Sequence, residues 1–160
     1  MISDSYSIKQ AQAAAEIAAA RMLFEEYAGG IGINLDFQDF ATELATLPGA
    51  YVPPSGALLL AVEGETPVGC VAMRPLARPA ICEMKRLYVR PAGRGRGYGE
   101  ALVHAIIASA RAAGYERMRL DTLPTMAHAQ TLYRRLGFQE IPAYRYNPVP
   151  GTTYMELRLY

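Results

Sequence analysis

Apolar residues at intervals of three and four predict four helices. We expect them at about residues 10–27 and 36–47, from the end of a glycine-rich segment to residue 113, and at about 125–136. Gly29-Gly30 stop the first helix, Gly114 caps the third and Gly137 ends the fourth. The second helix begins at the N-cap residue Asp36, and one face of it carries Phe37, Phe40, Leu44 and Leu47.

Short apolar runs between turn residues predict the strands. They are expected at residues 6–9, 57–62, 67–73, 81–89, 115–121, 138–141 and 153–159. Hairpins combined with strand–helix–strand units imply one mixed, largely antiparallel sheet of about six to seven strands, with about four helices divided between its faces. Because no linker or shift of composition divides the chain, we expect a single α/β (α+β) domain over residues 1–160.

Composition and charge narrow the class of protein. Apolar residues make up 51% of the chain and charged ones 19%, which is ordinary for a globular domain. The net charge of +1 argues against broad nucleic-acid binding. The longest apolar run, Ala57–Val62, is too short to span a bilayer, and the first residues lack the pattern of a signal peptide. We therefore expect a cytoplasmic protein in which Cys70 and Cys82 are buried thiols, without the spacing of a metal site.

The segment Arg90–Gly99, RPAGRGRGYG, contains four glycines and three arginines between a predicted strand and a predicted helix. Glycines are costly to order, but they let successive backbone N–H groups converge on one anion at a helix N-terminus. Arg94 and Arg96 add positive charge, with Arg86 and Arg90 nearby. The segment therefore predicts a polyphosphate site, and a solvated basic loop is the alternative.

Two nucleotide-binding templates do not fit this loop. A Walker A loop needs Lys followed by Ser or Thr, which is absent from the segment. The dinucleotide pattern G-x-G-x-x-G fails in both frames, because its last position is Tyr98 or Glu100. What fits instead is Arg94-x-x-Gly97-x-Gly99.

R-x-x-G-x-G after a strand ending Leu-Tyr-Val, at the start of a helix, resembles the acetyl-CoA loop of the GCN5-related N-acetyltransferases. The segment 129–138, AQTLYRRLGF, is similar to that family's A-x-x-L-Y-x-x-x-G-F on the helix after the next strand. The two motifs span residues 81–138, and the strand order extends the likeness to nearly the whole chain. The resemblance implies the acyl-CoA N-acyltransferase fold and a small single-domain member of unassigned substrate.

The resemblance also implies how acetyl-CoA binds. In the family, backbone amides of the loop hold the coenzyme A pyrophosphate, and the end of the preceding strand pairs with the pantetheine arm. One amide of that strand end polarises the thioester carbonyl, as an oxyanion needs fixed donors. The implied loop residues are Arg94, Gly95, Arg96, Gly97, Tyr98 and Gly99, and the implied strand residues are Leu87, Tyr88 and Val89.

Two side chains are implied to be catalytic. Tyr133 occupies the position of the tyrosine that protonates the departing thiolate, and packing in the core is the alternative. Glu83 lies on the strand where members of the family often carry a carboxylate base, which would deprotonate the acceptor amine. Its alternative is a structural ion pair with Lys85, two residues along the same strand face.

One position departs from the family pattern. Many members have asparagine seven residues before the tyrosine, where it contacts pantetheine, whereas this chain has Met126. Thr125 and Asp121 are the alternatives for that contact. His104 and His128 have no partner at catalytic spacing, so we interpret both as structural or exposed.

The acceptor side is less specified by the sequence. The loop Gly29–Phe40, which includes Phe37, and the segment 144–147 should flank the acetyl end of the cofactor. In the second segment, Tyr144, Tyr146 and Asn147 offer stacking and hydrogen bonds, and Arg145 offers a partner for a carboxylate. Core packing is the alternative for Phe37 and Phe40. This pattern favours a primary amine of a small or amino-acid-like molecule, acetylated by direct attack in a ternary complex.

Three other functions remain open from the sequence. They are transfer of a larger acyl group, a non-catalytic sensor of acyl-CoA, and an RNA-binding module built on the RGRG run. The last is disfavoured because Tyr98 alone interleaves the arginines. The expected partner is therefore a small-molecule amine rather than a nucleic acid or a membrane, and a homodimer is left open.

Overall fold

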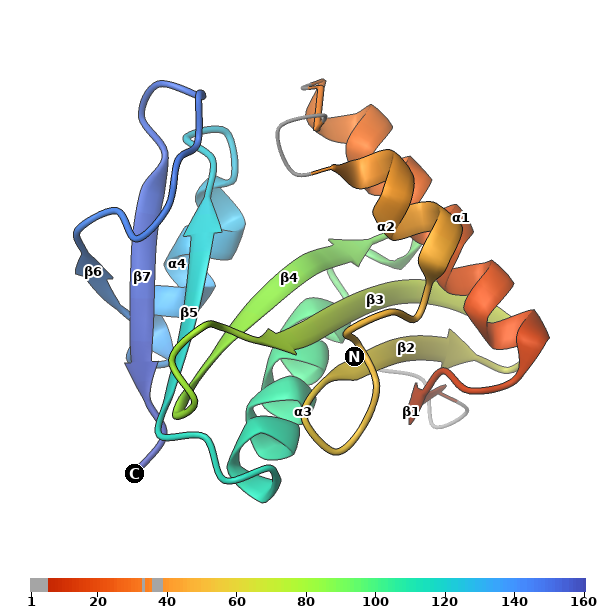
Figure 1. The fold of residues 1–160 in the computed structure, drawn as a ribbon. Helices are drawn as coiled ribbons and strands as arrows, with labels where there is room; N and C mark the ends of the chain where they lie inside the picture. The colour runs from red at the N-terminus through yellow and green to blue at the C-terminus, as the bar shows by residue number, and fades with distance from the viewer. Residues whose placement is uncertain (1–5, 33, 36–38) are drawn as a thin grey trace.

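The computed structural model describes residues 6–32, 34–35 and 39–160, which form one seven-stranded sheet with four α-helices (Figure 1). The strands are β1 (Tyr6–Gln10), β2 (Ala57–Glu63), β3 (Thr66–Pro75), β4 (Ile81–Val89), β5 (Arg117–Thr122), β6 (Gln139–Ile141) and β7 (Thr153–Arg158). The helices are α1 (Ala14–Ile31), α2 (Phe40–Thr46), α3 (Tyr98–Ala112) and α4 (Ala127–Arg135), with a short 3-10 helix η2 (Pro91–Gly93).

The sheet is mixed and largely antiparallel, as the sequence predicted. Its strand order is β1-β2-β3-β4-β5-β7-β6. Only the central pair, β4 and β5, is parallel among the described strand pairs. The crossover from β4 to β5 runs through α3, which is the usual way to join parallel neighbours.

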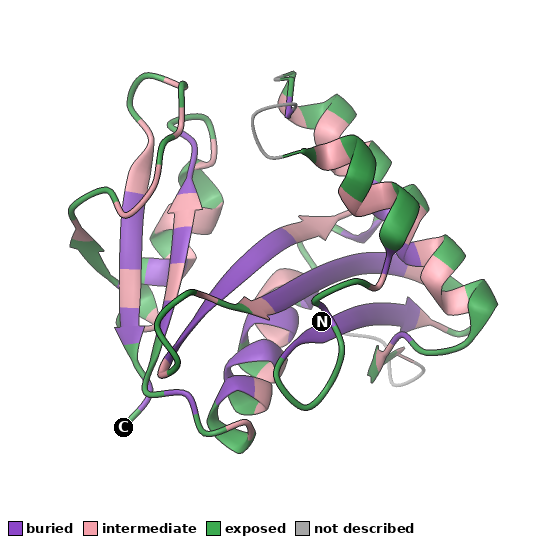
Figure 2. Cartoon of the chain, in the orientation of Figure 1, coloured by how far each residue is buried: buried purple, intermediate pink, exposed green. Residues whose placement is uncertain are grey.

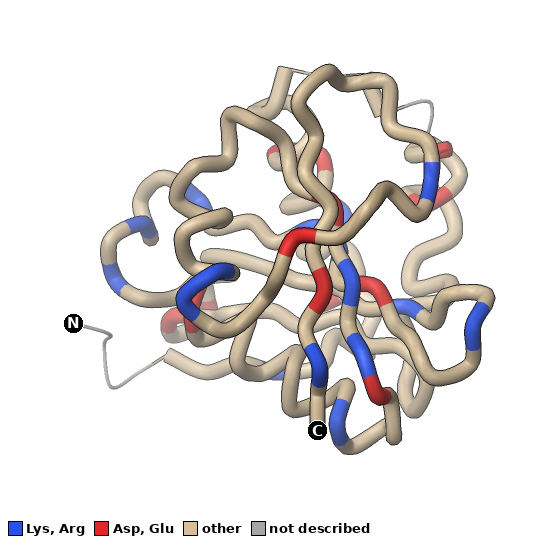
Figure 3. The backbone as a smooth tube through the Cα atoms, turned by 90° about the vertical axis from the view of Figure 1, so that its left-hand side faces the viewer, with Lys and Arg blue, Asp and Glu red and all other residues tan. Residues whose placement is uncertain are grey.

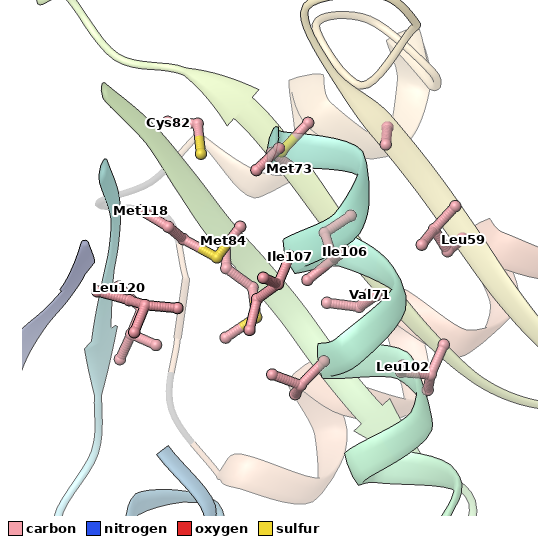
Figure 4. Close-up of a cluster of buried hydrophobic side chains, with 14 of the residues drawn as sticks. Leu59, Val71, Met73, Cys82, Met84, Leu102, Ile106, Ile107, Met118 and Leu120 are labelled. Carbon is pink, nitrogen blue, oxygen red and sulfur yellow. The ribbon is translucent and has the colours of Figure 1, made fainter. Parts of the chain in front are cut away.

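Alternating side chains of the strands build one core on each face of the sheet. In β2, Leu59 packs on the face covered by α3, whereas Leu58 and Leu60 pack on the face covered by α1. Figure 4 shows the first core, where Leu102, Ile106 and Ile107 of α3 lie over β3 and β4. Figure 2 shows the result: the central strands are buried and the helices expose one side.

The β4–β5 pair separates part-way along its length. Ile81, Cys82 and Glu83 pair with the first residues of β5, and the pairing ends there. Figure 1 shows the two strands diverging toward their carboxyl ends. Beyond Glu83, one edge of β4 therefore has no neighbouring strand to satisfy its backbone groups.

A β-bulge lies in the separated half of β4. Cys70 of β3 pairs with Tyr88, and Ala72 pairs with Lys85, so one residue of β3 faces two residues of β4, Arg86 and Leu87. Arg86 has a φ of 61°, in the left-handed region that a non-glycine residue rarely adopts. A bulge bends the strand and redirects its side chains, and bulges are frequent beside active sites.

An ion pair joins the bulge to α2. Arg86 donates two hydrogen bonds to Glu43, at 2.9 and 2.8 Å, and only 2% of the arginine side chain is exposed. The guanidinium group also lies 5.1 Å from the ring centre of Phe40 and 5.7 Å from that of Tyr27. Since α2 buries no residue completely, these contacts with Arg86 fix its position on the sheet.

Ion pairs also line the β5–β7 side of the sheet. Glu156 of β7 accepts from Arg119 at 2.8 Å and lies 3.3 Å from Arg117. Figure 3 shows basic and acidic positions next to one another on this side of the molecule. The opposite charges offset one another, which agrees with the small net charge.

Several boundaries differ from the sequence predictions. Helix α1 begins at Ala14 because Gln10 belongs to β1, where it pairs with Leu59. The helix also continues through Gly29 and Gly30 to Ile31, and Gly32 ends it with a φ of 66°. A left-handed C-cap glycine is the usual helix end, so the prediction chose the wrong glycine. The N-cap predicted at Asp36 lies outside the described residues.

Two further expectations concern thiols and membranes. Cys70 and Cys82 are buried free thiols, as predicted, and burial raises the pKa of each well above its ordinary value. Within the described part of the chain, no helix combines the length and apolar character needed to cross a bilayer.

The buried pair of Arg86 and Glu43 gives a prediction for stability. Glu43→Ala leaves a guanidinium group buried without its carboxylate, which typically costs about 3–5 kcal/mol. Thermal unfolding should therefore show a clear loss of stability, whereas Glu25→Ala, at an exposed position of α1, should change stability by less than about 0.5 kcal/mol. Equal unfolding temperatures for the two variants would show that the pair does not hold α2.

Candidate active site

A cleft of about 790 Å³ opens where β4 and β5 diverge. This volume is typical of sites for small molecules and cofactors. Its walls come from the end of α1, the separated half of β4, the loop before α3, the end of β5 and the start of α4. The described residues that line it are Tyr27, Gly30, Ile31, 84–89, Arg94, Gly95, 97–99, Leu120, Asp121, 125–129, Leu132 and Tyr133.

The glycine-rich loop presents free backbone donors to this cleft. Gly95 and Gly97 have φ values of 80° and 84°, which turn the chain into the first turn of α3. Among the described residues, the N–H groups of residues 95–100 have no hydrogen-bond acceptor, whereas that of Ala101 bonds to Gly97. A Cβ atom at Gly95 would meet nothing within 4 Å. The arrangement is that of an anion-binding helix N-terminus.

Most arginines around the loop already have carboxylate partners. Arg90 pairs with Glu26 of α1 at 2.7 Å, and Arg86 pairs with Glu43. Arg96 pairs with Glu63 at 3.1 Å, and that carboxylate also accepts from the Tyr98 hydroxyl. The side chain of Arg94 lines the cleft and donates to the Val89 carbonyl at 3.1 Å. The loop therefore offers an anion mainly its amides and one guanidinium group.

The predicted strand residues Leu87, Tyr88 and Val89 all line the cleft. They follow the bulge and lie on the half of β4 that β5 does not pair with. An extended molecule in the cleft can therefore hydrogen-bond to this edge in the way a strand would.

Tyr133 lines the opposite wall and is 6% exposed. Its ring packs against Phe138 at a centroid distance of 5.5 Å. Burial raises the pKa of its hydroxyl well above the usual value, so the phenol is protonated at neutral pH. The side chain is thus both a core residue and part of the cleft wall.

Glu83 lies just behind the cleft wall, with its side chain fully buried. Its carboxylate accepts from Arg74 at 3.1 Å and from the Tyr144 hydroxyl at 2.5 Å. Arg145 lies 2.6 Å from the same oxygen as Tyr144. Glu83 thus forms ion pairs with Arg74 and Arg145. The sequence prediction had named Lys85 as the partner and did not identify these two arginines. Glu83 is not among the described residues that line the cleft.

The segment predicted to meet the acceptor is bound to the sheet at this point. Arg145 also lies 3.4 Å from Asp121, and Asn147 donates to Asp121 at 3.2 Å. Tyr144 is thereby fixed over Glu83, whereas Tyr146 is 76% exposed. Phe37 lies outside the described residues.

Lys85 is a wall residue that the sequence prediction named only as a partner for Glu83. It is 7% exposed and lines the cleft two residues beyond the end of the β4–β5 pairing. Burial lowers the pKa of its amine to about 7, helped by the positive charge of Arg86. The amine is therefore a mixture of charged and neutral forms at neutral pH.

Met126, which replaces the asparagine of the family pattern, is the N-cap residue of α4. Met126, Thr125 and Asp121 all line the cleft, so each of the alternatives considered is in place. His128 is exposed at the mouth of the cleft, and His104 is exposed 3.6 Å from Glu100 on α3.

The sequence profile of the Acetyltransferase (GNAT) family matches residues 15–138. This chain belongs to the GNAT acetyltransferase family. It is therefore an acyltransferase that depends on acetyl-CoA. An uncharacterized N-acetyltransferase of Schizosaccharomyces pombe is 44% identical over 140 residues, which cover 87% of this chain and 86% of that protein.

Solved GNAT structures share the fold. An acetyltransferase of Streptococcus agalactiae superposes with a TM-score of 0.80 at 20% identity, covering 98% of this chain and 99% of the other. An acetyltransferase of Salmonella typhimurium, solved with its cofactor acetyl-CoA, gives a TM-score of 0.67 at 21% identity and covers 98% and 95%. The predicted fold and family are thus confirmed.

The buried amine of this GNAT enzyme gives a prediction for stability against pH. In the unfolded chain Lys85 titrates near 10.5 and in the folded chain near 7, so the unfolded state binds more protons between these values and stability rises with pH. Each unit of difference is worth about 1.4 kcal/mol. Lys85→Met, which has no charge to bury, should be more stable than the parent by several kcal/mol at pH 6 and should lose that advantage by pH 10.

Denaturant unfolding at several pH values measures this difference. Lys9→Met is the matched control, because Lys9 is the other lysine in the chain and its side chain is 47% exposed. A stability difference for Lys85→Met that does not change between pH 6 and 10 would contradict the depressed pKa.

Proposed function

We propose that this protein transfers the acetyl group of acetyl-CoA to a primary amine of a small or amino-acid-like molecule, by direct attack in a ternary complex. One observation carries the proposal. The cleft joins free amides at the N-terminus of α3 to the unpaired edge of β4, and Tyr133 lines the same cleft. Such a site accommodates a long molecule with a phosphate end and an extended arm.

The residues present fit acetyl-CoA. The proposed donors to the diphosphate are the amides of Arg94, Gly95, Arg96, Gly97, Tyr98 and Gly99. Among the described residues, only the Arg94 amide of this set already donates to a backbone carbonyl, that of Pro91. Leu87, Tyr88 and Val89 would pair with the pantetheine arm along the free edge of β4. When bound, acetyl-CoA supplies a thioester carbonyl that an amine can attack.

Tyr133 is the proposed acid. Its hydroxyl is protonated at neutral pH and faces the same cleft as the β4 edge. It can therefore donate a hydrogen bond to sulfur and deliver a proton as negative charge develops there. The base role predicted for Glu83 stays a prediction, and its contacts with Tyr144 and Arg145 join it to the acceptor side.

The acceptor is proposed to enter beside β4, between α2 and the segment 144–147. Phe37, Tyr144, Tyr146 and Asn147 are the side chains proposed to contact it. Two guanidinium groups lie near the Tyr144 ring, with Arg119 at 5.4 Å and Arg145 at 5.8 Å from its centre. These stacking and charged groups favour a small molecule over a long peptide.

A panel of amines tests the proposed reaction. The purified protein is mixed with acetyl-CoA and with amino acids, polyamines or arylalkylamines one at a time, and free thiol is measured. We expect one class of amine to accelerate thiol release well above the hydrolysis rate. Thiol release that no amine accelerates would rule out the transferase function and favour the acyl-CoA sensor, and faster release from longer thioesters would favour a larger acyl group.

Binding of the cofactor should stabilise the folded protein. Acetyl-CoA at 100 times its Kd should add about 2.7 kcal/mol to the free energy of unfolding, which thermal unfolding detects as a raised Tm. NAD and ATP serve as controls, since the loop fits neither nucleotide pattern. A Tm raised equally by all three would mean that the loop binds phosphate without recognising the pantetheine arm.

Tyr133→Phe separates the acid role from packing. The variant keeps the aromatic ring and its contact with Phe138, but it removes the hydroxyl group that would donate the proton. We expect kcat to fall by about 100-fold, as for loss of a general acid, while the KM for acetyl-CoA and the Tm change little. An unchanged kcat would assign this tyrosine to the core alone.

A further inference from the structure

The proposed reaction needs a proton acceptor in the cleft. An amine is mostly protonated at neutral pH, and its lone pair must be freed before it can attack. An efficient base has a pKa near the working pH and lies in the site that the amine enters. The described side chains that line the cleft include one group of this kind on the strand beside the thioester position, Lys85.

The position of Lys85 is set by the strand divergence and the bulge. It is the last residue of β4 with a partner in β3 before the register shifts, opposite Ala72. Its neighbour along the strand is Arg86, at the bulge, and the predicted pantetheine edge begins one residue later at Leu87. The lysine thus lines the cleft at the acetyl end of the proposed cofactor site.

The charges that act on Lys85 come from three parts of the fold. Arg86 of β4, Arg145 of the β6–β7 connection and Arg74 of β3 disfavour its protonation, and Glu83 favours it. Arg86 is balanced by Glu43 of α2, and Arg145 by Asp121 of β5. Burial is the largest effect of all. Burial and the three arginines together lower the pKa of the amine to about 7, which favours its neutral form far more than in an exposed lysine.

The two carboxylates nearby are already occupied. Glu83 is fully buried and accepts from Arg74 and Tyr144 while lying 2.6 Å from Arg145. Asp121 lines the cleft but accepts from Asn147 and lies 3.4 Å from Arg145. Both carboxylates therefore fix the segment 144–147 against the sheet, which is a positioning role.

We propose that Lys85, in its neutral form, is the general base that takes a proton from the acceptor ammonium group. The inference rests on the proposed function. The acceptor gives one proton to the lysine Nζ, and the lone pair that this frees forms the C–N bond. The C–S bond then breaks with its electron pair on sulfur, which takes a proton from Tyr133. The second proton of the attacking nitrogen leaves as the amide forms, and it restores the Tyr133 hydroxyl through water. Lys85 returns its own proton to water after the product leaves.

The pH dependence of kcat/KM tests the role, with acetyl-CoA and the best amine of the panel. In the parent protein, activity should be lost as the pH falls through about 7, because the protonated lysine accepts no proton. Lys85→Met and Lys85→Arg should lower kcat/KM at pH 7 by 100-fold or more and remove this limb of the profile. The KM for acetyl-CoA should stay the same, and Lys9→Met should behave as the parent.

Glu83→Gln distinguishes the two bases. Because the carboxylate favours the protonated lysine, its removal should move the acidic limb to lower pH without abolishing it. If Glu83 were the base, the limb would disappear in Glu83→Gln and persist in Lys85→Met, and the inference would be overturned.

The protonation of Lys85 can also be measured directly by NMR, without an activity assay. In protein labelled with 13C-lysine, Lys85 and Lys9 give the two side-chain signals, and Lys9→Met assigns them. The Lys85 signal should titrate with a midpoint near pH 7, and a Lys85 that stays protonated through pH 9 would overturn the inference. Failure of the proposed function is a separate outcome, because it appears as absent thiol release with every amine.

Discussion

The active-site cleft depends on the divergence of two parallel strands. β4 and β5 pair over three residues and then separate, so the backbone of β4 keeps a free edge in the middle of a sheet. A free edge would normally be covered or would invite pairing with another chain. Here α1, α4 and the loop before α3 surround it, which leaves a cleft that an extended ligand can complete.

The charged groups at this divergence form two sets of ion pairs. Arg86 holds α2 through Glu43, and Glu83 with Asp121 holds the β6–β7 connection through Arg145. The acceptor side is therefore assembled from segments that the sheet fixes by ion pairs. The same charges, together with burial, set the proton affinity of Lys85. Positioning of the acceptor side and the proposed proton transfer to Lys85 thus depend on the same part of β4.

Sequence patterns predicted the local features of the fold well. Strand β4 and the hairpin β2–β3 were predicted because each strand is a short apolar run between turn residues. The glycine-rich loop was predicted because its glycines and arginines are adjacent in the sequence. The prediction ended the first helix at Gly29-Gly30, whereas in the structure both glycines are helical and the left-handed residue Gly32 ends the helix. Partners such as Glu43 for Arg86 and Tyr144 for Glu83 could not be predicted, because they lie 43 and 61 residues apart and meet only after the sheet forms. Lys85 shows the same limit in part. Its lowered pKa arises first from burial, which the sequence does not give, then from Arg86 beside it on β4, and also from Arg145 and Arg74 on other elements.

A crystal structure of the protein with coenzyme A bound is the most direct test of the account. It predicts that the diphosphate oxygens accept hydrogen bonds from backbone amides between Arg94 and Gly99, while the pantetheine arm pairs with β4 at Leu87–Val89. A diphosphate bound elsewhere, or the same amides filled by the protein's own carbonyl groups with the β4 edge left unpaired, would contradict it.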